Sequence, residues 1–502
     1  MSPDAEAPAG TIIDRLELFA RERPDAPAIV GIDRTVTYRE LHAMVGGCAD
    51  WLAAQDIDGG ECVGVTIPDN LLHFVVALGL ASLGAAHATL ASHDPEPVRA
   101  QLASRVRARR VIATHASHRL PGLAFIPVDP EQMATWAGRG TVTLRKPVAS
   151  ATFTYFSTSG TTGEAKLIPV LHGQVGLQAA RAVVGRALPL SSIEHIYAKR
   201  QFLYAVSEGA TVVLPGPPGT PVAQLCAALD VDVIGCMNVQ ARNLVAESAR
   251  HGRLPAGMLV RTGGSRGSAQ FRRDLLEHVC DAVEITYSMQ ECGSIASATE
   301  RSAAEVTETV GRPHPGVRVL IVDDRGTPMP PGEIGEIRIR APGMSTGYLD
   351  DERATARHFS DGWFRPGDLG TFTPDGVLIV YGRADDVMIL NGIKIAPAEI
   401  ERVLERHPAV KAVAAFPLPS PVHGELPVAA VELVAGASAD ERELQTFARE
   451  ALGLRAPRRV MIVSALPSTV QGKVDIRRLA EMAAIGVRAV TFESSGDADW
   501  LR

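Results

Sequence analysis

The sequence has few cysteines, and their spacing forms no pattern. The six cysteines among 502 residues include no C-x-x-C pair. Disulfide frameworks and cysteine metal sites depend on regular, close spacing, so neither is indicated. The pattern is typical of a reducing compartment, and we expect a cytoplasmic protein.

Long apolar runs are also absent. Stretches such as Phe74–Ala86 are too short or are interrupted by glycine, whereas a membrane-spanning helix needs about 20 apolar residues. The segment Met1–Glu6 lacks the basic and apolar regions of a secretory signal. We therefore expect neither membrane insertion nor secretion.

An excess of positive charge is lacking as well. The formal net charge is -7, with 50 Lys and Arg residues against 57 Asp and Glu residues. A general nucleic-acid binder needs a basic face to neutralise phosphates, so nucleic acid is not an expected partner. The densest basic cluster, Arg105–Arg110, is interpreted as a solvated helix end that precedes a strand.

Short apolar strands alternate with helical stretches along the first part of the chain. This alternation is typical of βαβ units and of a mostly parallel sheet. The predicted strands are Ala28–Val30, Val63–Ile67, Val111–Ala113 and Thr211–Leu214. Near residue 310 the pattern changes to antiparallel hairpins, with turns at residues 324–326 and 374–376.

A second change of pattern follows Arg383. Beyond it, helices and strands alternate on a smaller scale, and Pro397 is expected to begin a helix. We predict an N-terminal domain of residues 1–383 and a C-terminal domain of residues 384–502. The predicted fold class is α/β. It comprises a large N-terminal domain of mostly parallel sheets with a β-rich subdomain, and a small mobile α+β C-terminal domain.

A loop rich in glycine and hydroxyl groups follows the predicted strand Thr152–Tyr155. It comprises Thr158, Ser159, Gly160, Thr161, Thr162, Gly163 and, after two further residues, Lys166. Glycines let backbone N–H groups turn toward an anion, hydroxyls add donors, and the lysine supplies a positive charge. The loop suits a polyphosphate, although the G-x-x-x-x-G-K-[ST] spacing is absent. Taken by itself, it is equally compatible with a flexible Ser/Gly loop.

Four further segments accompany this loop. They are Tyr287–Glu291, Gly362–Gly370, Gly382–Asp386 (with Asn391-Gly392 and Glu399–Glu401), and Pro467–Val474. Together with the loop they resemble, in the same order, the signature motifs of the acyl-CoA synthetases, peptide-synthetase adenylation domains and luciferases. The chain is identified as a member of this adenylate-forming superfamily from five motifs between residues 155 and 479.

The resemblance implies a ligase that uses MgATP to activate a carboxylic acid as its acyl-AMP, with release of pyrophosphate. Because two anions must meet, such a site needs positive charge and Mg²⁺. Lys473 resembles the family lysine that bridges the acid and the α-phosphate. Glu291 matches the family Mg²⁺ ligand, and Thr161 is a second candidate. The alternatives are a surface lysine and a carboxylate at a helix start.

The resemblance also assigns residues to the nucleotide. Tyr287 offers its ring to adenine, Asp368 accepts hydrogen bonds from the ribose hydroxyls, and Arg383 contacts the ribose. Gly263 and Gly264 lie where the backbone approaches the adenylate. The alternatives are a buried core tyrosine for Tyr287 and a plain β-turn for the glycine pair.

Several positions depart from the family pattern. Ser288 replaces a glycine, and Gln290 replaces a threonine that contacts phosphate; an amide can donate the same hydrogen bond but is longer. Pro366 replaces a threonine before Gly367. The charged groups are retained, so the departures affect geometry and rate more than the reaction class. A nucleotide-binding pseudoenzyme is the non-enzyme alternative.

Two more residues take roles from the resemblance. His172 follows the phosphate loop at the family position, where it either gates the acyl pocket or is a satisfied structural histidine. Asp385 holds the hinge position, about which the C-terminal domain of relatives rotates between the two half-reactions.

The acyl pocket is expected to include the segment 193–202. Amino-acid-activating relatives carry an Asp here, and this segment has none, so an α-amino acid is disfavoured. Lys199 and Arg200 are interpreted as solvated charges, with contact to an anionic acyl tail as the alternative. Coenzyme A is the leading acceptor. The phosphopantetheine of a carrier protein and an amine are the alternatives.

Overall fold

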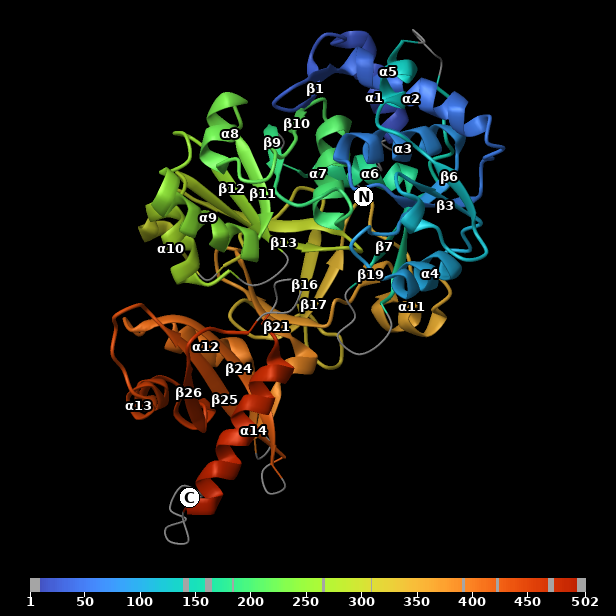
Figure 1. Ribbon diagram of the computed structural model, residues 1–502. Helices are drawn as coiled ribbons and strands as arrows, with labels where there is room; N and C mark the ends of the chain where they lie inside the picture. Colours follow the sequence, from blue (N-terminus) through green and yellow to red (C-terminus); the bar gives the residue numbers. More distant parts are fainter. Residues whose placement is uncertain are drawn as a thin grey trace.

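The described part of the chain contains four β-sheets, which helices cover (Figure 1). The computed structural model describes residues 10–138, 144–158, 165–182, 185–263, 267–307, 309–390, 393–420, 424–467 and 474–493. Three of the sheets described there belong to the larger N-terminal part. The fourth builds the smaller C-terminal part, which lies below it in Figure 1.

The N-terminal sheet has the strand order β6-β5-β3-β4-β7-β8, and all its neighbours are parallel except β7 and β8. Its strands are β3 (Cys62–Thr66), β4 (Ala86–Thr89), β5 (Arg110–Ala113), β6 (Ala124–Pro127), β7 (Thr152–Ser157) and β8 (Leu167–Leu171). Helices α3 (Asn70–Leu83) and α4 (Glu96–Arg105) connect successive strands, as the alternating pattern predicts. Nearly all residues of helix α3 are buried, so the helix is apolar on nearly every side.

The nine-stranded sheet has the order β15-β14-β13-β12-β11-β9-β10-β1-β2. Its strands are β1 (Pro27–Val30), β2 (Thr35–Thr37), β9 (Arg186–Pro189), β10 (Thr211–Val213), β11 (Val233–Met237), β12 (Leu259–Gly263), β13 (Ala282–Met289), β14 (Gly293–Glu300) and β15 (Arg312–Pro313). The strands from β1 to β13 in this order are parallel neighbours. Its helices are α7 (Ile196–Ser207), α8 (Val222–Ala228), α9 (Asn238–His251) and α10 (Ala269–His278).

These two sheets share one hydrophobic core, to which α1 (Ile12–Glu22), α2 (Tyr38–Ala53), α5 (Gln132–Ala137) and α6 (His172–Ala179) also contribute. Capping boxes begin α1 at Thr11 and α2 at Thr37, so their first N–H groups are satisfied. Ile12, Ile13, Leu16 and Phe19 of α1 are buried, whereas Leu18 is partly exposed.

The antiparallel sheet contains the hairpins predicted beyond residue 310. Its strands are β16 (Arg318–Val322), β17 (Gly335–Arg340), β18 (Phe359–Ser360), β19 (Trp363–Phe364), β20 (Asp368–Phe372) and β21 (Leu378–Arg383), with helix α11 (Glu352–His358) beside them. Strands β16 and β17 pair in an antiparallel manner, which confirms the predicted hairpin. Gly376, at the tip of the turn between β20 and β21, has φ +80°, in the left-handed region that glycine adopts without strain.

The C-terminal sheet comprises β22 (Met388–Leu390), β23 (Ile393–Ile395), β24 (Val410–Ser420), β25 (Gly424–Leu433) and β26 (Arg459–Val463). Helices α12 (Pro397–Leu404), α13 (Glu441–Leu452) and α14 (Ile476–Glu493) accompany it. Short 3₁₀ turns lie at Ala116–His118, Ala303–Glu305, Ala384–Asp386 and Gly453–Arg455. The predicted fold class is confirmed. The boundary after residue 383 stays a prediction, supported by the change of sheet between Arg383 and Met388.

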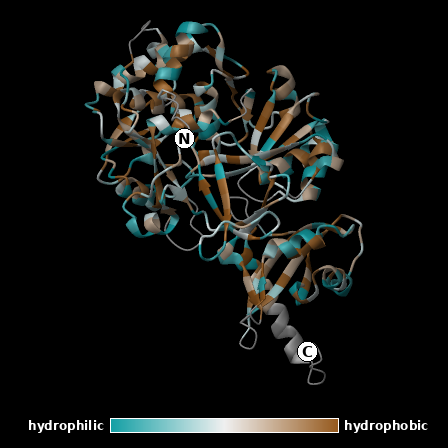
Figure 2. Ribbon diagram, turned by 180° about the vertical axis from the view of Figure 1, so that it is seen from behind, coloured by the Kyte–Doolittle hydropathy of each residue, from teal (hydrophilic) through white to brown (hydrophobic). Residues whose placement is uncertain are grey.

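Hydrophobic residues concentrate on the strands, and hydrophilic residues on the outer helices and loops (Figure 2). Within the described ranges, no helix is both long enough and apolar enough to span a bilayer. All six cysteines are buried and free.

Helix α2 packs against α5 with no room for a side chain at Gly47. A Cβ there would lie 2.6 Å from the Trp136 Cα, and backbone cannot move aside as a side-chain end can. We expect Gly47→Ala to lower the free energy of unfolding by about 1–3 kcal/mol, measured by urea titration. The control is Gly138→Ala, where the nearest atom would be 3.6 Å away. Equal urea midpoints for the two variants would contradict the close packing.

Candidate active site

The β7–β8 hairpin brings the two described ends of the glycine-rich loop together. The Thr158 N–H donates to the Lys166 carbonyl at 2.9 Å, and the Lys166 N–H donates to Thr158 Oγ1 at 3.2 Å. The predicted residues between them, Ser159, Gly160, Thr161, Thr162 and Gly163, lie outside the described residues. The hairpin therefore presents Thr158 and Lys166 at one point.

Two residues of the segment between β17 and β18, which includes α11, hold the Lys166 ammonium. Lys166 Nζ lies 2.9 Å from His358 Nε2 and 5.1 Å from the centre of the Tyr348 ring. His358 Nδ1 lies 2.8 Å from the Arg365 carbonyl oxygen, which can only accept, so Nδ1 carries the hydrogen. The neutral Nε2 is then free to accept from Lys166. Burial lowers the pKa of both side chains, which favours the neutral imidazole.

Tyr287 and Asp368 meet where the nine-stranded sheet approaches the antiparallel sheet. The Tyr287 hydroxyl donates to Asp368 Oδ2 at 2.7 Å, and Asp368 is only 5% exposed. Arg383, at the end of β21, lies 3.5 Å from Asp368 Oδ1. Burial raises the pKa of Asp368, while the Tyr287 hydrogen bond and the Arg383 charge oppose the shift. The three residues assigned to the nucleotide are thus neighbours.

Glu291 follows β13 in the turn before β14, so its interpretation as a carboxylate at a helix start is wrong. Its Oε1 accepts from the Tyr348 hydroxyl at 2.8 Å, and its backbone oxygen accepts from the Ser345 N–H at 2.8 Å. In the described part of the chain no hydrogen bond reaches Oε2. One fixed carboxylate with a free oxygen fits a hard cation that keeps several water ligands.

No group of three or more His, Cys, Asp or Glu side chains in the described ranges could hold a metal ion by itself. A divalent cation at Glu291 would therefore need oxygens from water or from a phosphate. The other predicted metal ligand, Thr161, is among the residues that are not described.

The interpretation of Lys199 as a solvated charge is wrong. Its side chain is 3% exposed and donates to Thr89 Oγ1, and its Nζ lies 3.1 Å from His87 Nε2. Burial lowers the pKa of Lys199 to about 7. These partners lie on β4 of the N-terminal sheet, so α7 buries a polar face there.

Arg200 is not solvated either. Its guanidinium donates to the carbonyl oxygens of Met289 at 3.1 Å and Gln290 at 2.6 Å, and lies 5.0 Å from the centre of the Phe156 ring. Helix α7 therefore contacts both parallel sheets, and Arg200 holds the turn that carries Glu291.

His172 begins α6 and is fully buried. Neither of its ring nitrogens has a hydrogen-bond partner in the described part, and burial lowers its pKa to about 4. No described residue supplies the partner that a satisfied structural histidine would need, so the described contacts do not support that alternative. A gating role stays a prediction.

The remaining predicted residues lie near these groups or outside the described residues. Gly263 ends β12, in register with Thr286. Ser288 pairs with Ser294 across the β13–β14 ladder, and Gln290 Oε1 is buried without a partner among the described residues. Gly264 and Lys473 are not described.

Asp385 lies in the 3₁₀ turn Ala384–Asp386, between the antiparallel and C-terminal sheets. Its side chain is 61% exposed and lies 3.7 Å from Arg357 and 3.8 Å from Arg383. Both pairs tie the turn to the N-terminal part of the chain, which is compatible with the predicted hinge.

Sequence reasoning missed Tyr348 and His358. Their partners Glu291 and Lys166 are 57 and 192 residues away in the sequence. No local spacing links residues so far apart, and neither tyrosine nor histidine is unusual beside a short helix.

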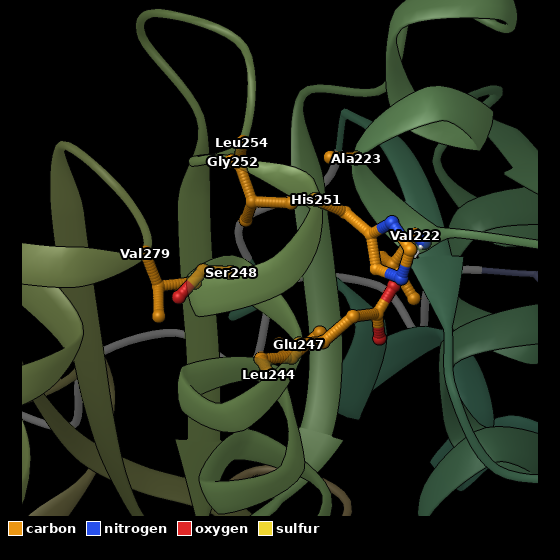
Figure 3. Close-up of a pocket in the computed structure, with 9 residues that line it drawn as sticks. All are labelled: Val222, Ala223, Leu244, Glu247, Ser248, His251, Gly252, Leu254 and Val279. Carbon is orange, nitrogen blue, oxygen red and sulfur yellow. Dashed lines mark hydrogen bonds between the residues drawn. The ribbon is translucent and has the colours of Figure 1, made fainter.

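The pocket between α8 and α9 does not compete with this site (Figure 3). Its volume is about 10 Å³, room for one water molecule. Glu247, one of its lining residues, accepts a hydrogen bond from the Val222 N–H at 2.6 Å. A substrate of any size is excluded there.

Two protein-family models and several known proteins match most of the chain. Residues 16–349 match the family model described as AMP-binding enzyme, and residues 399–473 match the AMP-binding enzyme C-terminal domain. Novobiocin biosynthesis protein H of Streptomyces niveus is 28% identical over 515 residues, or 94% of this chain and 83% of that protein. A medium/long-chain-fatty-acid–[acyl-carrier-protein] ligase of Mycobacterium tuberculosis is 28% identical over 524 residues, or 94% of this chain and 95% of that protein.

A solved structure also resembles the chain. The o-succinylbenzoate CoA synthetase of Bacillus subtilis, in complex with the acyl-adenylate intermediate OSB-AMP, has a TM-score of 0.78 and 24% identity. The match covers 93% of this chain and 97% of that one. At this identity the likeness shows a shared fold.

The buried Lys199 predicts a pH dependence of stability. Because its pKa falls from 10.5 to about 7 on folding, the unfolded chain binds more protons between these values. The free energy of unfolding therefore rises with pH across that window. We expect Lys199→Met to lose this rise between pH 7 and 9 relative to the wild type, measured by urea titration. The exposed Lys411→Met is the control and should keep the wild-type slope. Parallel slopes for all three proteins would contradict the burial of a titrating lysine.

Proposed function

The chain belongs to the AMP-binding enzymes, and we propose that it uses MgATP to convert a carboxylic acid into its acyl-AMP and passes the acyl group to a thiol. It is an AMP-forming ligase similar to acyl-CoA synthetases. The reaction joins a carboxylate oxygen to the α-phosphorus of ATP and expels pyrophosphate. The thiol then displaces AMP from the acyl carbon.

The observation that carries this proposal is the position of Tyr348 between Lys166 and Glu291. The ring faces the Lys166 ammonium, and the hydroxyl donates to the Glu291 carboxylate. The Tyr348 side chain therefore lies between a cation that can bind phosphate oxygens and a carboxylate that can bind Mg²⁺. The positive Lys166 suits the negative triphosphate, and the negative Glu291 suits the positive metal ion.

The nucleoside part of ATP is assigned to the adjoining cluster. Asp368 accepts hydrogen bonds from the ribose hydroxyls, with Arg383 beside it, and Tyr287 orients both the carboxylate and the adenine. Gly263, Ser288 and Gln290 surround the adenylate. Thr158 and the glycine-rich loop after it bind the phosphates.

Lys473 supplies the second positive charge, between the acid and the α-phosphate. Its assignment rests on the Gly-Lys motif alone. Thr161 is assigned as a second ligand of Mg²⁺ on the same kind of sequence argument.

Coenzyme A is the proposed acceptor, and the free, buried cysteines support a cytoplasmic location. Transfer to a carrier-protein phosphopantetheine is the second candidate. It is favoured by the similarity over 94% of this chain to an acyl-carrier-protein ligase. Asp385 is the proposed hinge for moving from the first step to the second.

The proposal is tested by measuring pyrophosphate release across a panel of carboxylic acids, with coenzyme A, holo-carrier protein and hydroxylamine as acceptors. Acid-dependent release is expected with at least one acid, and thioester formation with one of the two thiols. Formation of a hydroxamate without any thioester would indicate that the acceptor is an amine rather than a thiol. ATP binding with no release from any acid would identify a pseudoenzyme.

We expect Tyr348→Phe to lower kcat/KM for adenylation about 10- to 100-fold. The variant loses a hydrogen bond to a charged group, worth about 1.5–3 kcal/mol. Added Mg²⁺ should restore part of the activity, because the loosened carboxylate still binds the ion. The control is Tyr381→Phe, since the described residues give the Tyr381 hydroxyl no partner. Full activity in Tyr348→Phe would show that Tyr348 does not position the carboxylate proposed to bind Mg²⁺.

We expect ATP to be preferred over 2′-deoxy-ATP, and Asp368→Asn to lose most of this preference. The amide oxygen of Asn can still accept from Tyr287, so the fold is kept while the charged acceptor for the diol is lost. The ratio of kcat/KM values for the two nucleotides measures the effect. The exposed Asp375→Asn serves as the control. An unchanged ratio in Asp368→Asn would place the ribose elsewhere.

A further inference from the structure

Buried polar atoms without partners gather beside one face of the nine-stranded sheet. On α7, both the Nε2 and the Oε1 of Gln201 are buried and make no hydrogen bond to any described residue. On β12, Nη2 of Arg261 is in the same condition. Folded proteins rarely leave such atoms unpaired, so three of them together mark a position where a water molecule or a polar group of a ligand is expected to bind.

The register of the strands brings these atoms together. Gly235, Arg261 and Glu284 are direct partners across β11, β12 and β13, so their side-chain positions share one face. A Cβ at Gly235 would lie 1.8 Å from Gln201 Oε1. The Gln201 amide therefore rests on the bare backbone of Gly235, beside Arg261. We call Gln201, Arg261 and Glu284 the polar row.

The opposite face of the same strands is apolar. Ile234, Val260 and Val283 are register partners there, and each is fully buried beneath α9 and α10. On the α7 side, by contrast, the same strands carry the Gln201 amide over Gly235 and the Arg261–Glu284 ion pair. These polar groups are unusual on the face of a buried sheet. Packing alone does not explain them.

The polar row lies one strand step from the proposed adenylate position. Arg261 and Gly263 are two residues apart on β12 and share a face, a separation of about 6.6 Å. In parallel sheets, ligands bind at the carboxyl ends of the strands, where Gly263 lies. An acyl tail that points from that end along the α7 face would reach the polar row.

The chemistry of the polar row selects the group it would bind. Arg261 Nε donates to Glu284 Oε1 at 2.7 Å, so the charges of this pair are already balanced. The remaining groups are donors on Arg261 Nη2 and Gln201 Nε2, and an acceptor on Gln201 Oε1. An alkyl tail would satisfy none of them, and a carboxylate could not donate to Oε1. A hydroxyl both accepts and donates.

We propose that the acid activated by this enzyme carries a hydroxyl group about 6–7 Å from its carboxyl carbon, bound between Gln201 and Arg261. This inference rests on the proposed function and narrows its substrate class. Gln201 and Arg261 are then specificity residues, separate from the groups that bind ATP.

The test compares acids that differ only at the distal position. 4-Hydroxyphenylacetate is paired with phenylacetate and 4-carboxyphenylacetate, and 5-hydroxypentanoate with pentanoate, in acid-dependent pyrophosphate release. At least one hydroxy acid should exceed its unsubstituted partner by about 100-fold or more in kcat/KM. Gln201→Leu should reduce that ratio to below about 10-fold. Preference for the unsubstituted acid or for 4-carboxyphenylacetate, or an unchanged ratio in Gln201→Leu, overturns the inference and leaves the proposed function standing. No release with any acid overturns both.

A second measurement does not depend on turnover. Because the Gln201 amide is unpaired, Gln201→Leu should raise the Tm of the ligand-free protein. Gln178 is the matched control: its Nε2 donates to the Gly343 carbonyl at 2.7 Å, and its Oε1 accepts from the Tyr204 hydroxyl at 2.9 Å. Gln178→Leu should therefore lower the Tm. A lower Tm in both variants would mean that Gln201 has a structural partner, and would overturn the inference.

Discussion

The hydrogen bond from Tyr287 to Asp368 is the contact on which the arrangement of the site depends. It joins β13 of the nine-stranded sheet to β20 of the antiparallel sheet, across 81 residues of sequence. Glu291 lies in the turn that follows β13, close in sequence to Tyr287. Arg383 is the register partner of Asp368 on the neighbouring strand β21. The nucleotide-binding, metal-binding and hinge assignments therefore share one fixed junction between two sheets.

Buried cations hold the segments around that junction. Arg181 donates to four backbone carbonyls, those of Leu177, Cys292, Ser294 and Pro342, and so fixes the chain just after Glu291. Arg200 holds the two residues just before it. Burying a guanidinium is costly unless its N–H groups are satisfied, and here backbone oxygens satisfy most of them. The turn that carries Glu291 is thereby held from both sides.

The sequence predicted what depends on local spacing. Alternating strands and helices, the β16–β17 hairpin and the start of α12 at Pro397 all follow from short-range patterns. The proximity of Tyr287 and Asp368 was implied through family motifs. Tyr348 and His358 could not be predicted, because their roles depend on contacts far apart in sequence. Lys199 was misread because a helix between two sheets has no solvent face for its charges, and the polar row appears only once strand register is known.

In the proposed reaction the carboxylate oxygen of the acid attacks the α-phosphate of ATP. The most direct test supplies an accepted acid labelled with ¹⁸O in its carboxyl group, together with ATP and the thiol, and measures the masses of the products. We expect one ¹⁸O in AMP, because the acyl carbon–oxygen bond breaks when the thiol attacks. Label in inorganic phosphate, or AMP without label, would contradict an acyl-adenylate and with it the assignment of the site.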